Sequence, residues 1–346
     1  MTLEPAATVG TQTAVWLLAS ARRRLELPLG DALATLPPSV ATVAAYQCGL
    51  ADEPSGEPRG AGKAVRPALV LAASMAVGGQ AEHSLPAAVA VELVHNSSLL
   101  HDDIIDNDTQ RRHRPAAWTR FGTGRSLLTG DVLLALAWEV LLRVPRHQGG
   151  LASLLLARAV RELAHGQAWD VDFEGRATVS VQEYLTMAAA KTAALLKCSC
   201  ALGALLGGGD AGAVDALADY GHHLGMVLQL TDDVLGVWGD PAVTGKPVGS
   251  DIRARKKSLP VVLALATRGR HAERLADLYA QPGQLTGEQV RTAIELIDRT
   301  GARARMNDVV NSQLRRIHEL LTCMNLTGQQ LELLTALARY LAHRRH

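Results

Sequence analysis

Apolar residues recur at helical spacing along almost the whole chain. Alanine, leucine and valine occupy positions three and four apart, with polar residues between them, which is typical of helices that bury one face. Alternating β-branched and polar residues, which would predict strands, are nearly absent. The pattern predicts an all-α protein with helices over 13–26, 66–77, 85–106, 127–143, 150–168, 180–206, 211–237, 257–267, 287–300, 302–323 and 327–344.

Glycine and proline mark the breaks between these segments. Stretches rich in them, at 51–62, 174–178 and 239–251, predict loops. Ser180, followed three places later by Glu183, fits the capping box that starts many helices.

No internal repeat, low-complexity tract or linker divides the chain. Hydrophobic residues make up 48% of the 346 residues and aromatics only 3%, so leucine, alanine and valine must fill a large core. We expect a single all-α domain of about eleven or more helices over 13–346, after a flexible tail at 1–12.

Charge and hydropathy exclude several classes of partner. The net charge of +1 argues against bulk binding to nucleic acid or to an anionic membrane. No apolar run reaches about 18 residues without a charge or a breaker, and the N-terminal stretch with Glu4 lacks the basic start of a signal peptide. We expect no stable membrane insertion.

The four cysteines are dispersed, and only Cys198 and Cys200 lie close together. This pair lacks the second pair that a zinc site would need. We therefore interpret all four as reduced core residues of a cytoplasmic protein.

Three aspartates, Asp102, Asp103 and Asp106, lie within five residues of the stretch HNSSLLHDDIIDNDTQRR. The segment that carries them otherwise reads as apolar. Asp102 and Asp106 share one face of the predicted helix, and Asp103 lies at its edge. Carboxylates this close repel each other unless a cation separates them, and Mg²⁺ prefers oxygen ligands and phosphates. The alternative is a solvated helix end or ion pairs with Arg111 and Arg112.

A second pair of acids, Asp232 and Asp233, lies in another apolar segment, LQLTDDVLGVWGD. The position four residues after Asp232 holds Gly236, and the next acid is Asp240. Two acid clusters inside apolar helices are hard to explain as surface decoration. If the helices face each other, the clusters form two walls of a metal site.

Lysine is rare, with six lysines among 35 basic side chains. Lys63 precedes Arg66 in GKAVRP, Lys191 lies in the apolar stretch AAAKTAALL, and Lys246 follows a glycine in a predicted loop. Each alone could be an ordinary solvated lysine. Together they favour a site that holds phosphate groups between metal and cations.

The segments GKAVRP, HNSSLLHDDIIDNDTQRR, GDVLLALAWEVL, KTAALL and LQLTDDVLGVWGDPAVTGKPVGSDIRARKKSLP, in this order, resemble the trans (head-to-tail) isoprenyl diphosphate synthases of the polyprenyl synthetase family, most of all the geranylgeranyl diphosphate synthases. The resemblance covers about 60–340. It implies an all-α bundle around a central cavity (the isoprenoid synthase fold), usually as a homodimer. It also implies a Mg²⁺-dependent prenyltransferase that joins isopentenyl diphosphate to dimethylallyl, geranyl or farnesyl diphosphate.

The resemblance also assigns site residues. Matches to the catalytic positions are Asp102, Asp103, Asp106, Asp232, Asp233, Lys191 and Arg111. Three Mg²⁺ ions are expected, with Asp102, Asp106 and Asp232 as ligands. Matches to the isopentenyl diphosphate pocket are Lys63, Arg66, His95 and Arg112. Matches to the allylic diphosphate site are Arg111, Lys191, Thr192, Gln229 and Lys246. His95 alone could be a helix-packing residue, and we interpret His101 as structural.

Two positions depart from the family pattern. Leu228 stands where phenylalanine is common, and Gly236 replaces the last aspartate of the second motif. Both changes put the turnover rate and the hold on the third Mg²⁺ in doubt.

Product length depends on the residues before the first aspartate. In short-chain members a bulky aromatic stands four or five places earlier, where this chain has Ser98 and Ser97. The small side chains predict geranylgeranyl diphosphate (C20), with longer or shorter chains as alternatives. Ser97→Phe should shorten the product.

Other classes of protein remain open. A class I terpene cyclase has a similar acid motif but needs no isopentenyl diphosphate pocket, and a non-catalytic subunit of a heteromeric synthase needs no turnover. A metal-dependent phosphohydrolase could use His95, His101 and Asp102, but it would leave the second acid cluster unused. A calcium loop starting at Asp102 fails, because its twelfth position is His113.

Overall fold

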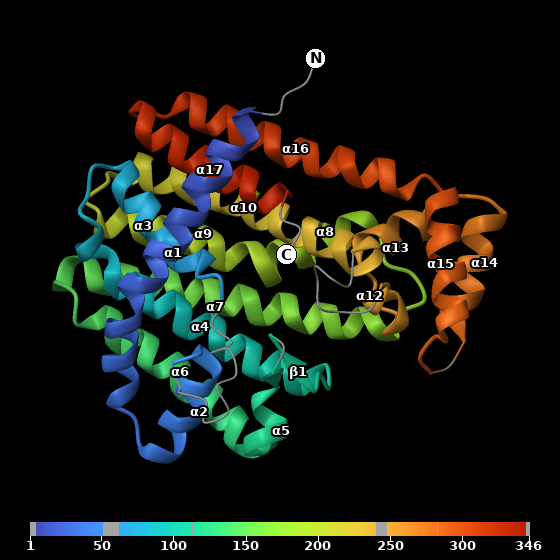
Figure 1. Ribbon diagram of the computed structural model, residues 1–346, viewed down its shortest axis with the longest axis horizontal. Coiled ribbons are helices and arrows are strands. Elements are labelled where there is room, and N and C mark those ends of the chain that lie inside the picture. Colours follow the sequence, from blue (N-terminus) through green and yellow to red (C-terminus); the bar gives the residue numbers. More distant parts are fainter. Residues whose placement is uncertain (1–4, 51–61, 113, 240–247, 282, 344–346) are drawn as a thin grey trace. The chain divides into compact units, whose positions relative to one another are not determined.

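The computed structural model describes residues 5–50, 62–112, 114–239, 248–281 and 283–343, and they are almost entirely helical (Figure 1). The predicted all-α class is confirmed. The helices are α1 (Pro5–Ala34), α2 (Pro38–Cys48), α3 (Val65–Ala76), η1 (Ala81–Ser84), α4 (Leu85–Ile105), α5 (Ala117–Phe121), α6 (Thr123–Leu142), α7 (Arg146–Gly175), α8 (Val181–Ala188), η2 (Ala189–Ala193), α9 (Ala194–Leu206), α10 (Ala211–Trp238), α12 (Ser250–Arg253), α13 (Leu259–Leu265), α14 (Arg270–Ala280), α15 (Gly287–Arg299), α16 (Ala302–Cys323) and α17 (Gly328–His343).

The described chain forms two compact units. Unit 1 comprises the chain up to Val160 with Leu195–Gly221 and Leu326–Leu334, and unit 2 comprises Arg161–Ala194, His222–Asn325 and the chain from Thr335. Divisions between the units fall inside α7, α9, α10 and α17, and the single domain expected over 13–346 stays a prediction. The helix α1 begins before the predicted start at 13, while the flexibility of the tail at 1–12 also stays a prediction.

In unit 1, α4 packs along α6 and also contacts α3 and α1 (Figure 1). Its small residues allow this close approach, because Ala87, Ala88 and Ala90 are fully buried. On α6, a Cβ atom added at Gly130 would lie 2.2 Å from Nε2 of His101. The imidazole of His101 therefore occupies space that only glycine leaves, in agreement with the structural role expected for it.

The core of unit 2 forms around α13, which is buried from Leu259 to Ala264 and contacts α8, α14, α15 and α16. The helix α8 begins with the predicted capping box. The Ser180 side chain accepts a hydrogen bond from the Glu183 N–H, and the Glu183 carboxylate accepts one from the Ser180 N–H. That prediction is confirmed.

Several elements were not expected. The helices α2, α5 and α14 lie in segments where no helix was predicted, and α2 packs against α6. The two-residue strands β1 (Gln110–Arg111) and β2 (Arg114–Pro115) pair antiparallel. The predicted helix 180–206 is interrupted by a π-helical turn, η2. Such turns are rare and occur frequently at functional sites.

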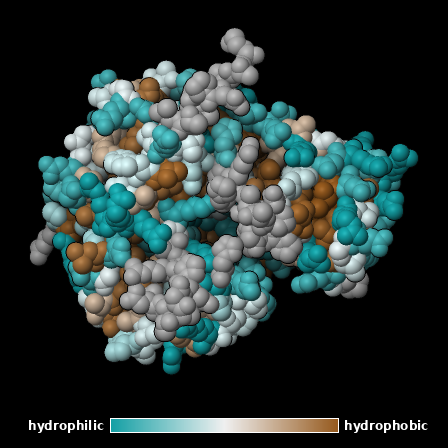
Figure 2. Space-filling view, in the orientation of Figure 1, coloured by the Kyte–Doolittle hydropathy of each residue, from teal (hydrophilic) through white to brown (hydrophobic). Residues whose placement is uncertain are grey.

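Within the described part of the chain, one helical stretch, Val181–Leu206, is long and apolar enough to cross a membrane, and an 18-residue window of it has a mean hydropathy of 1.4. About two thirds of it, 67%, is buried within the protein, and it contains Lys191. Both features are typical of a core helix. On the face drawn in Figure 2, apolar residues are scattered among polar ones.

Candidate active site

The first acid cluster ends α4 and divides into buried and accessible carboxylates. Asp103 is 1% exposed, whereas Asp102 and Asp106 are partly exposed. Oδ1 of Asp103 accepts two hydrogen bonds from Arg111, one from Nε at 2.8 Å and one from Nη2. Burial raises the pKa of the Asp103 carboxyl, and Arg111 opposes that shift. Asp103 thus holds Arg111, and Asp102 and Asp106 are left as the carboxylates of the accessible face.

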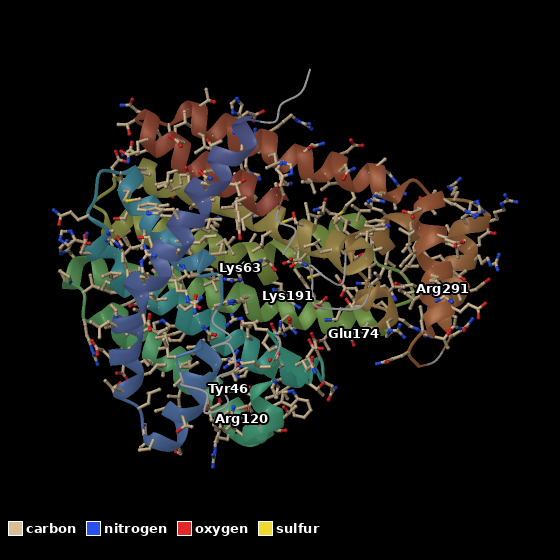
Figure 3. The ribbon with its side chains drawn as sticks, viewed as in Figure 1. Tyr46, Lys63, Arg120, Glu174, Lys191 and Arg291 are labelled. Atoms are coloured by element: carbon tan, nitrogen blue, oxygen red, sulfur yellow. The ribbon has the colours of Figure 1, made fainter. Side chains whose placement is uncertain are left out.

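Arg111 and Arg112 lie on the β1–β2 hairpin, and contacts with α2 hold this hairpin in place. The Tyr46 hydroxyl donates to the Pro115 carbonyl at 2.7 Å, and Nη2 of Arg114 donates to the Tyr46 carbonyl at 2.8 Å. Arg114 and Arg120 both lie over the Tyr46 ring, at 4.3 and 4.7 Å, and Figure 3 shows Tyr46 beside Arg120. Nothing in the sequence indicates that Tyr46 and Arg114 support the hairpin, because neither residue belongs to a motif.

Three of the four residues predicted for isopentenyl diphosphate, namely Arg66, His95 and Arg112, interact electrostatically within unit 1. Burial lowers the pKa of the Arg66 guanidinium to about 10; Glu92, Arg112 and Asp102 act on it as further charges. Burial, and then Arg66, Arg112 and Arg111, lower the pKa of the His95 imidazole well below its usual value. His95 is therefore neutral at pH 7 and surrounded by cations.

Backbone geometry at this cluster departs from the usual regions. Ala64 and Arg112 have φ values of 52° and 53°, which side chains other than glycine rarely adopt. Such strained residues gather at functional sites. A Cβ atom added at Gly62 would lie 2.7 Å from Nη2 of Arg112, so the glycine before Lys63 lets the arginine approach the backbone.

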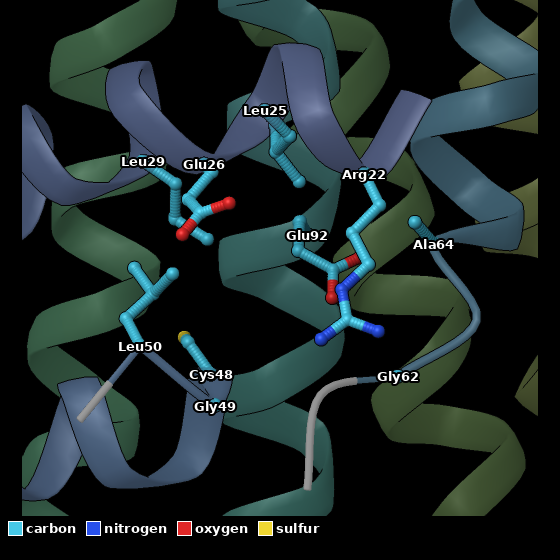
Figure 4. A pocket seen from close by; sticks show the side chains of 10 residues that line it. All are labelled: Arg22, Leu25, Glu26, Leu29, Cys48, Gly49, Leu50, Gly62, Ala64 and Glu92. Atoms are coloured by element: carbon cyan, nitrogen blue, oxygen red, sulfur yellow. The ribbon is translucent and has the colours of Figure 1, made fainter. Parts of the chain in front are cut away.

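A small pocket adjoins this cluster (Figure 4). The carboxylate of Glu92, one helical turn before His95, reaches it and accepts a hydrogen bond from Nδ2 of Asn96 at 3.1 Å. Glu92 is 7% exposed and supplies the buried negative charge next to Arg66 and Arg112. The lining residues are Arg22, Leu25, Glu26, Leu29, Cys48, Gly49, Leu50, Gly62, Ala64 and Glu92.

The second acid cluster, on α10 in unit 2, divides in the same way. Asp232 is exposed, and Asp233 is 4% exposed. Burial raises the pKa of the Asp233 carboxyl to about 7, although three donors oppose the shift: Tyr184, the Leu259 N–H and Gln229. The carboxylate that can reach an ion is therefore that of Asp232.

The sequence has a glycine, Gly236, at the third acid position of this motif, but the carboxylate of another residue occupies the space beside it. A Cβ atom added at Gly236 would lie 2.1 Å from Oδ2 of Asp251, so the carboxylate of α12 occupies the place beside Asp232 that Gly236 leaves. Sequence reasoning missed Asp251, because its contact with α10 spans a loop. Lys246 and Asp240 lie outside the described residues.

Lys191 lies in the π-turn η2, and its ammonium group pairs with the Asp170 carboxylate on α7 at 2.5 Å. This pair explains how a charged lysine is tolerated inside an apolar segment. Asp170 was missed because nothing in the sequence connects α7 with the turn. The next residue, Thr192, donates its hydroxyl to Oε1 of Gln229 at 2.5 Å, which brings these two predicted site residues together.

The π-turn fits because glycines on two neighbouring helices leave space for it. A Cβ atom added at Gly166 of α7 would lie 2.2 Å from the Lys191 nitrogen, and one at Gly225 of α10 would lie 2.5 Å from the Ala193 Cα. The wide turn therefore requires both glycines, and together they set the position of Lys191 and Thr192.

Comparisons with known proteins identify the family of the chain. The family model described as polyprenyl synthetase matches residues 57–297. The chain is 46% identical over 273 residues to a (2E,6E)-farnesyl diphosphate synthase of Mycobacterium tuberculosis, covering 78% of this chain and 76% of the relative. It is 43% identical over 293 residues to a geranylgeranyl diphosphate synthase of the same species, covering 82% of each chain.

A solved polyprenyl synthetase from Streptomyces coelicolor superimposes with a TM-score of 0.89 at 43% identity, covering 95% of this chain and 99% of that one. A solved geranylgeranyl pyrophosphate synthetase from Pyrococcus horikoshii gives a TM-score of 0.85 at 30% identity, covering 95% and 98%. The expected isoprenoid synthase fold is thereby confirmed. The chain belongs to the polyprenyl synthetase family of prenyltransferases.

Proposed function

We propose that this prenyltransferase condenses isopentenyl diphosphate head-to-tail with dimethylallyl, geranyl or farnesyl diphosphate and makes all-trans geranylgeranyl diphosphate. The observation that carries the proposal is the composition of one helix face. At helical spacing, His95, Asp102 and Asp106 follow one another along α4, and Arg66 lies within electrostatic reach of Asp102. Basic side chains suited to a second diphosphate thus adjoin an acid cluster, and a cyclase would not need them.

Asp102 and Asp106 of unit 1 and Asp232 of unit 2 would hold Mg²⁺, and we propose three ions. The carboxylates fit this metal, because they are the accessible acids of clusters whose second aspartate is buried. Among the described residues no three carboxylate, imidazole or thiol groups converge as in an all-protein metal site. That also fits Mg²⁺, which keeps water and phosphate oxygens in its shell. When bound, it neutralises charge that develops on the leaving diphosphate.

The side chains of the chain position the two substrates. Lys191, Arg111 and Lys246 would hold the allylic diphosphate, with Thr192 and Gln229 beside them, so that positive charge stabilises the leaving group as the C–O bond breaks. Lys63, Arg66, His95 and Arg112 would hold isopentenyl diphosphate, whose double bond attacks the allylic carbon. The proton lost afterwards would pass to the departed diphosphate.

Asp251 is expected to act as the missing third acid of the second motif. Asp251→Ala should raise the Mg²⁺ concentration for half-maximal activity about tenfold, as expected for losing one charged partner. Gly236→Asp alone should also be harmful, because its carboxylate would collide with that of Asp251. The double variant should recover part of the loss, since its carboxylate stands four residues after Asp232.

Magnesium titrations of the four proteins measure this directly, with Ser250→Ala as a neighbouring control. If Asp251→Ala needs no more Mg²⁺ than the wild type, Asp251 does not serve the second motif.

Product length is expected to depend on Ser98. The Ser97 hydroxyl is buried and donates to the Gly130 carbonyl on α6 at 2.8 Å, whereas Ser98 is partly exposed and lies one turn before Asp102. Ser98→Phe should therefore shift the product from C20 to C15 or shorter, and Ser97→Phe should mainly disturb the packing of α4 on α6. Chromatography of dephosphorylated products tests both; C20 from Ser98→Phe would remove Ser98 from the chain-length determinants. Relatives with C15 and C20 names are both similar, and farnesyl diphosphate is the alternative product.

We also expect a homodimer formed through α6 and α7. Leucines that are 44–62% exposed gather on these two helices of unit 1, namely Leu127, Leu128, Leu142, Leu151 and Leu154. Light scattering should give the mass of two chains for the wild type and of one chain for Leu128→Glu. Leu27→Glu on α1, at a leucine that is even more exposed, should stay dimeric. A monomeric wild type would contradict this interface.

The decisive assay incubates the purified chain with Mg²⁺, isopentenyl diphosphate and each of the C5, C10 and C15 allylic diphosphates. We expect prenyl diphosphates that end at C20. Hydrocarbon from the allylic substrate alone would indicate a cyclase, and no product from any pair would indicate a non-catalytic subunit. The four cysteines are free, which supports the cytoplasm as the place of action. Cys48, Cys198 and Cys200 are buried as predicted, whereas Cys323 is exposed, so its predicted place in the core is wrong.

A further inference from the structure

We infer that Tyr184 is a positioning residue of the allylic diphosphate site, acting through Asp233. The inference rests on the proposed function and concerns unit 2 alone. Neither residue would touch the substrate. Tyr184 belongs to no motif in the sequence, and its hydroxyl is the group whose removal tests the idea.

The side chains of Tyr184, Asp233, Gln229 and Thr192 form one continuous chain of hydrogen bonds. The Tyr184 hydroxyl donates to Oδ2 of Asp233, and Nε2 of Gln229 donates to Oδ1 of Asp233 at 2.9 Å. Oε1 of Gln229 in turn accepts from the Thr192 hydroxyl at 2.5 Å. This sequence of donors fixes the orientation of the Gln229 amide, since each of its ends has one complementary partner.

Asp233 also ties in a third element. Its Oδ2 accepts the backbone N–H of Leu259, the first residue of α13, at 2.7 Å. Tyr184 and Asp233 are 1% and 4% exposed, so these bonds form away from water, where losing a partner is costly. With three protein donors on one buried carboxylate, Asp233 serves as an anchor between α8, α10 and α13.

The anchor fixes two predicted functional groups. At one end, Thr192 follows Lys191 in the π-turn, so Gln229 sets the side of the turn that faces the diphosphate. At the other end, Asp233 is turned inward on α10, and its neighbour Asp232 is then presented outward. Losing the Tyr184 hydroxyl would leave the Asp233 carboxylate with two of its three donors, and this weaker hold would pass on to Gln229 and Thr192.

Tyr184→Phe removes only that hydroxyl. We expect the KM for the allylic diphosphate to rise about tenfold, the size expected for one hydrogen bond to a charged group. The KM for isopentenyl diphosphate should stay unchanged. Tyr220→Phe is the matched control: Tyr220 is fully buried, and its hydroxyl donates to the Leu334 carbonyl at 2.9 Å, within unit 1. It should leave both KM values unchanged, even if its thermal stability falls as much.

A double-mutant cycle adds a second, independent variant. Thr192→Val breaks the chain at its far end and should raise the same KM about tenfold. If the two residues act through one chain, the double variant should lose about tenfold in total. A hundredfold loss would mean independent effects and would overturn the inference, as would wild-type kinetics in Tyr184→Phe.

Calorimetric titration of each variant with inorganic diphosphate and Mg²⁺ separates this inference from the proposed function. If the wild type makes no prenyl diphosphate, the proposed function fails, but weaker diphosphate binding in Tyr184→Phe than in Tyr220→Phe still supports the positioning role. Equal binding in the two variants would refute it.

Discussion

Replacing Asp102 with alanine is expected to lower kcat by about 10²–10³-fold, the usual loss when one preorganised group that stabilises transition-state charge is removed. Asp102 is a partly exposed carboxylate on the accessible face of α4, and its buried neighbour Asp103 is already engaged by Arg111. We propose that Asp106 binds its own share of the metal and therefore does not replace Asp102. Steady-state kinetics at saturating substrates and several Mg²⁺ concentrations measures the effect.

The midpoint temperature of thermal unfolding of Asp102→Ala should stay close to that of the wild type, since the Asp102 side chain is not part of the core. Asp215→Ala, at an exposed acid of α10, is the control and should retain full activity. If Asp102→Ala kept kcat within threefold of the wild type, the first acid cluster would not be a metal site.

Gly166→Ala should lower both the stability of the protein and its affinity for the allylic diphosphate. The added Cβ would lie 2.2 Å from the Lys191 nitrogen and 2.7 Å from its Cα, so the backbone of the π-turn must move. Overpacking of this kind costs about 1–3 kcal/mol. We expect a lower free energy of unfolding and a KM for the allylic diphosphate raised at least tenfold, measured by denaturant titration and kinetics.

Gly150→Ala provides a control on the same helix. Nothing lies within 4 Å of its added Cβ, and alanine favours helix over glycine by about 1 kcal/mol. That variant should be as stable as the wild type or more so, with unchanged KM. If Gly166→Ala behaved like Gly150→Ala, the turn would not depend on close packing against α7.

The long helices could be predicted because their burial pattern is local. An amphipathic period shows within a short window of the sequence, as it does for α15, which was predicted over 287–300. The π-turn could not be predicted, because glycines on α7 and α10 allow it, and no local pattern reports contacts made by distant segments. The same holds for α2, which packs against α6.

The sequence predicts which residues make up the candidate site, but not the directions in which their side chains point. The acid motifs identify Asp102 and Asp232, but only the structure shows that the second aspartate of each pair is turned inward. Asp170 and Asp251 were missed for a related reason, since each acquires its meaning from a partner on another helix. Helical spacing gives the face of a residue, whereas tertiary packing decides what that face meets.

The central proposal is that both acid clusters bind Mg²⁺ and that the bound ions hold the diphosphate of the substrate. A crystal structure of the chain with Mn²⁺ and inorganic diphosphate, with the ions located by anomalous scattering, tests it most directly. We expect ions at Asp102 and Asp106 and an ion at Asp232, each with diphosphate oxygens among its ligands. An ion missing from either cluster, or ions that bind no diphosphate, would contradict the proposal.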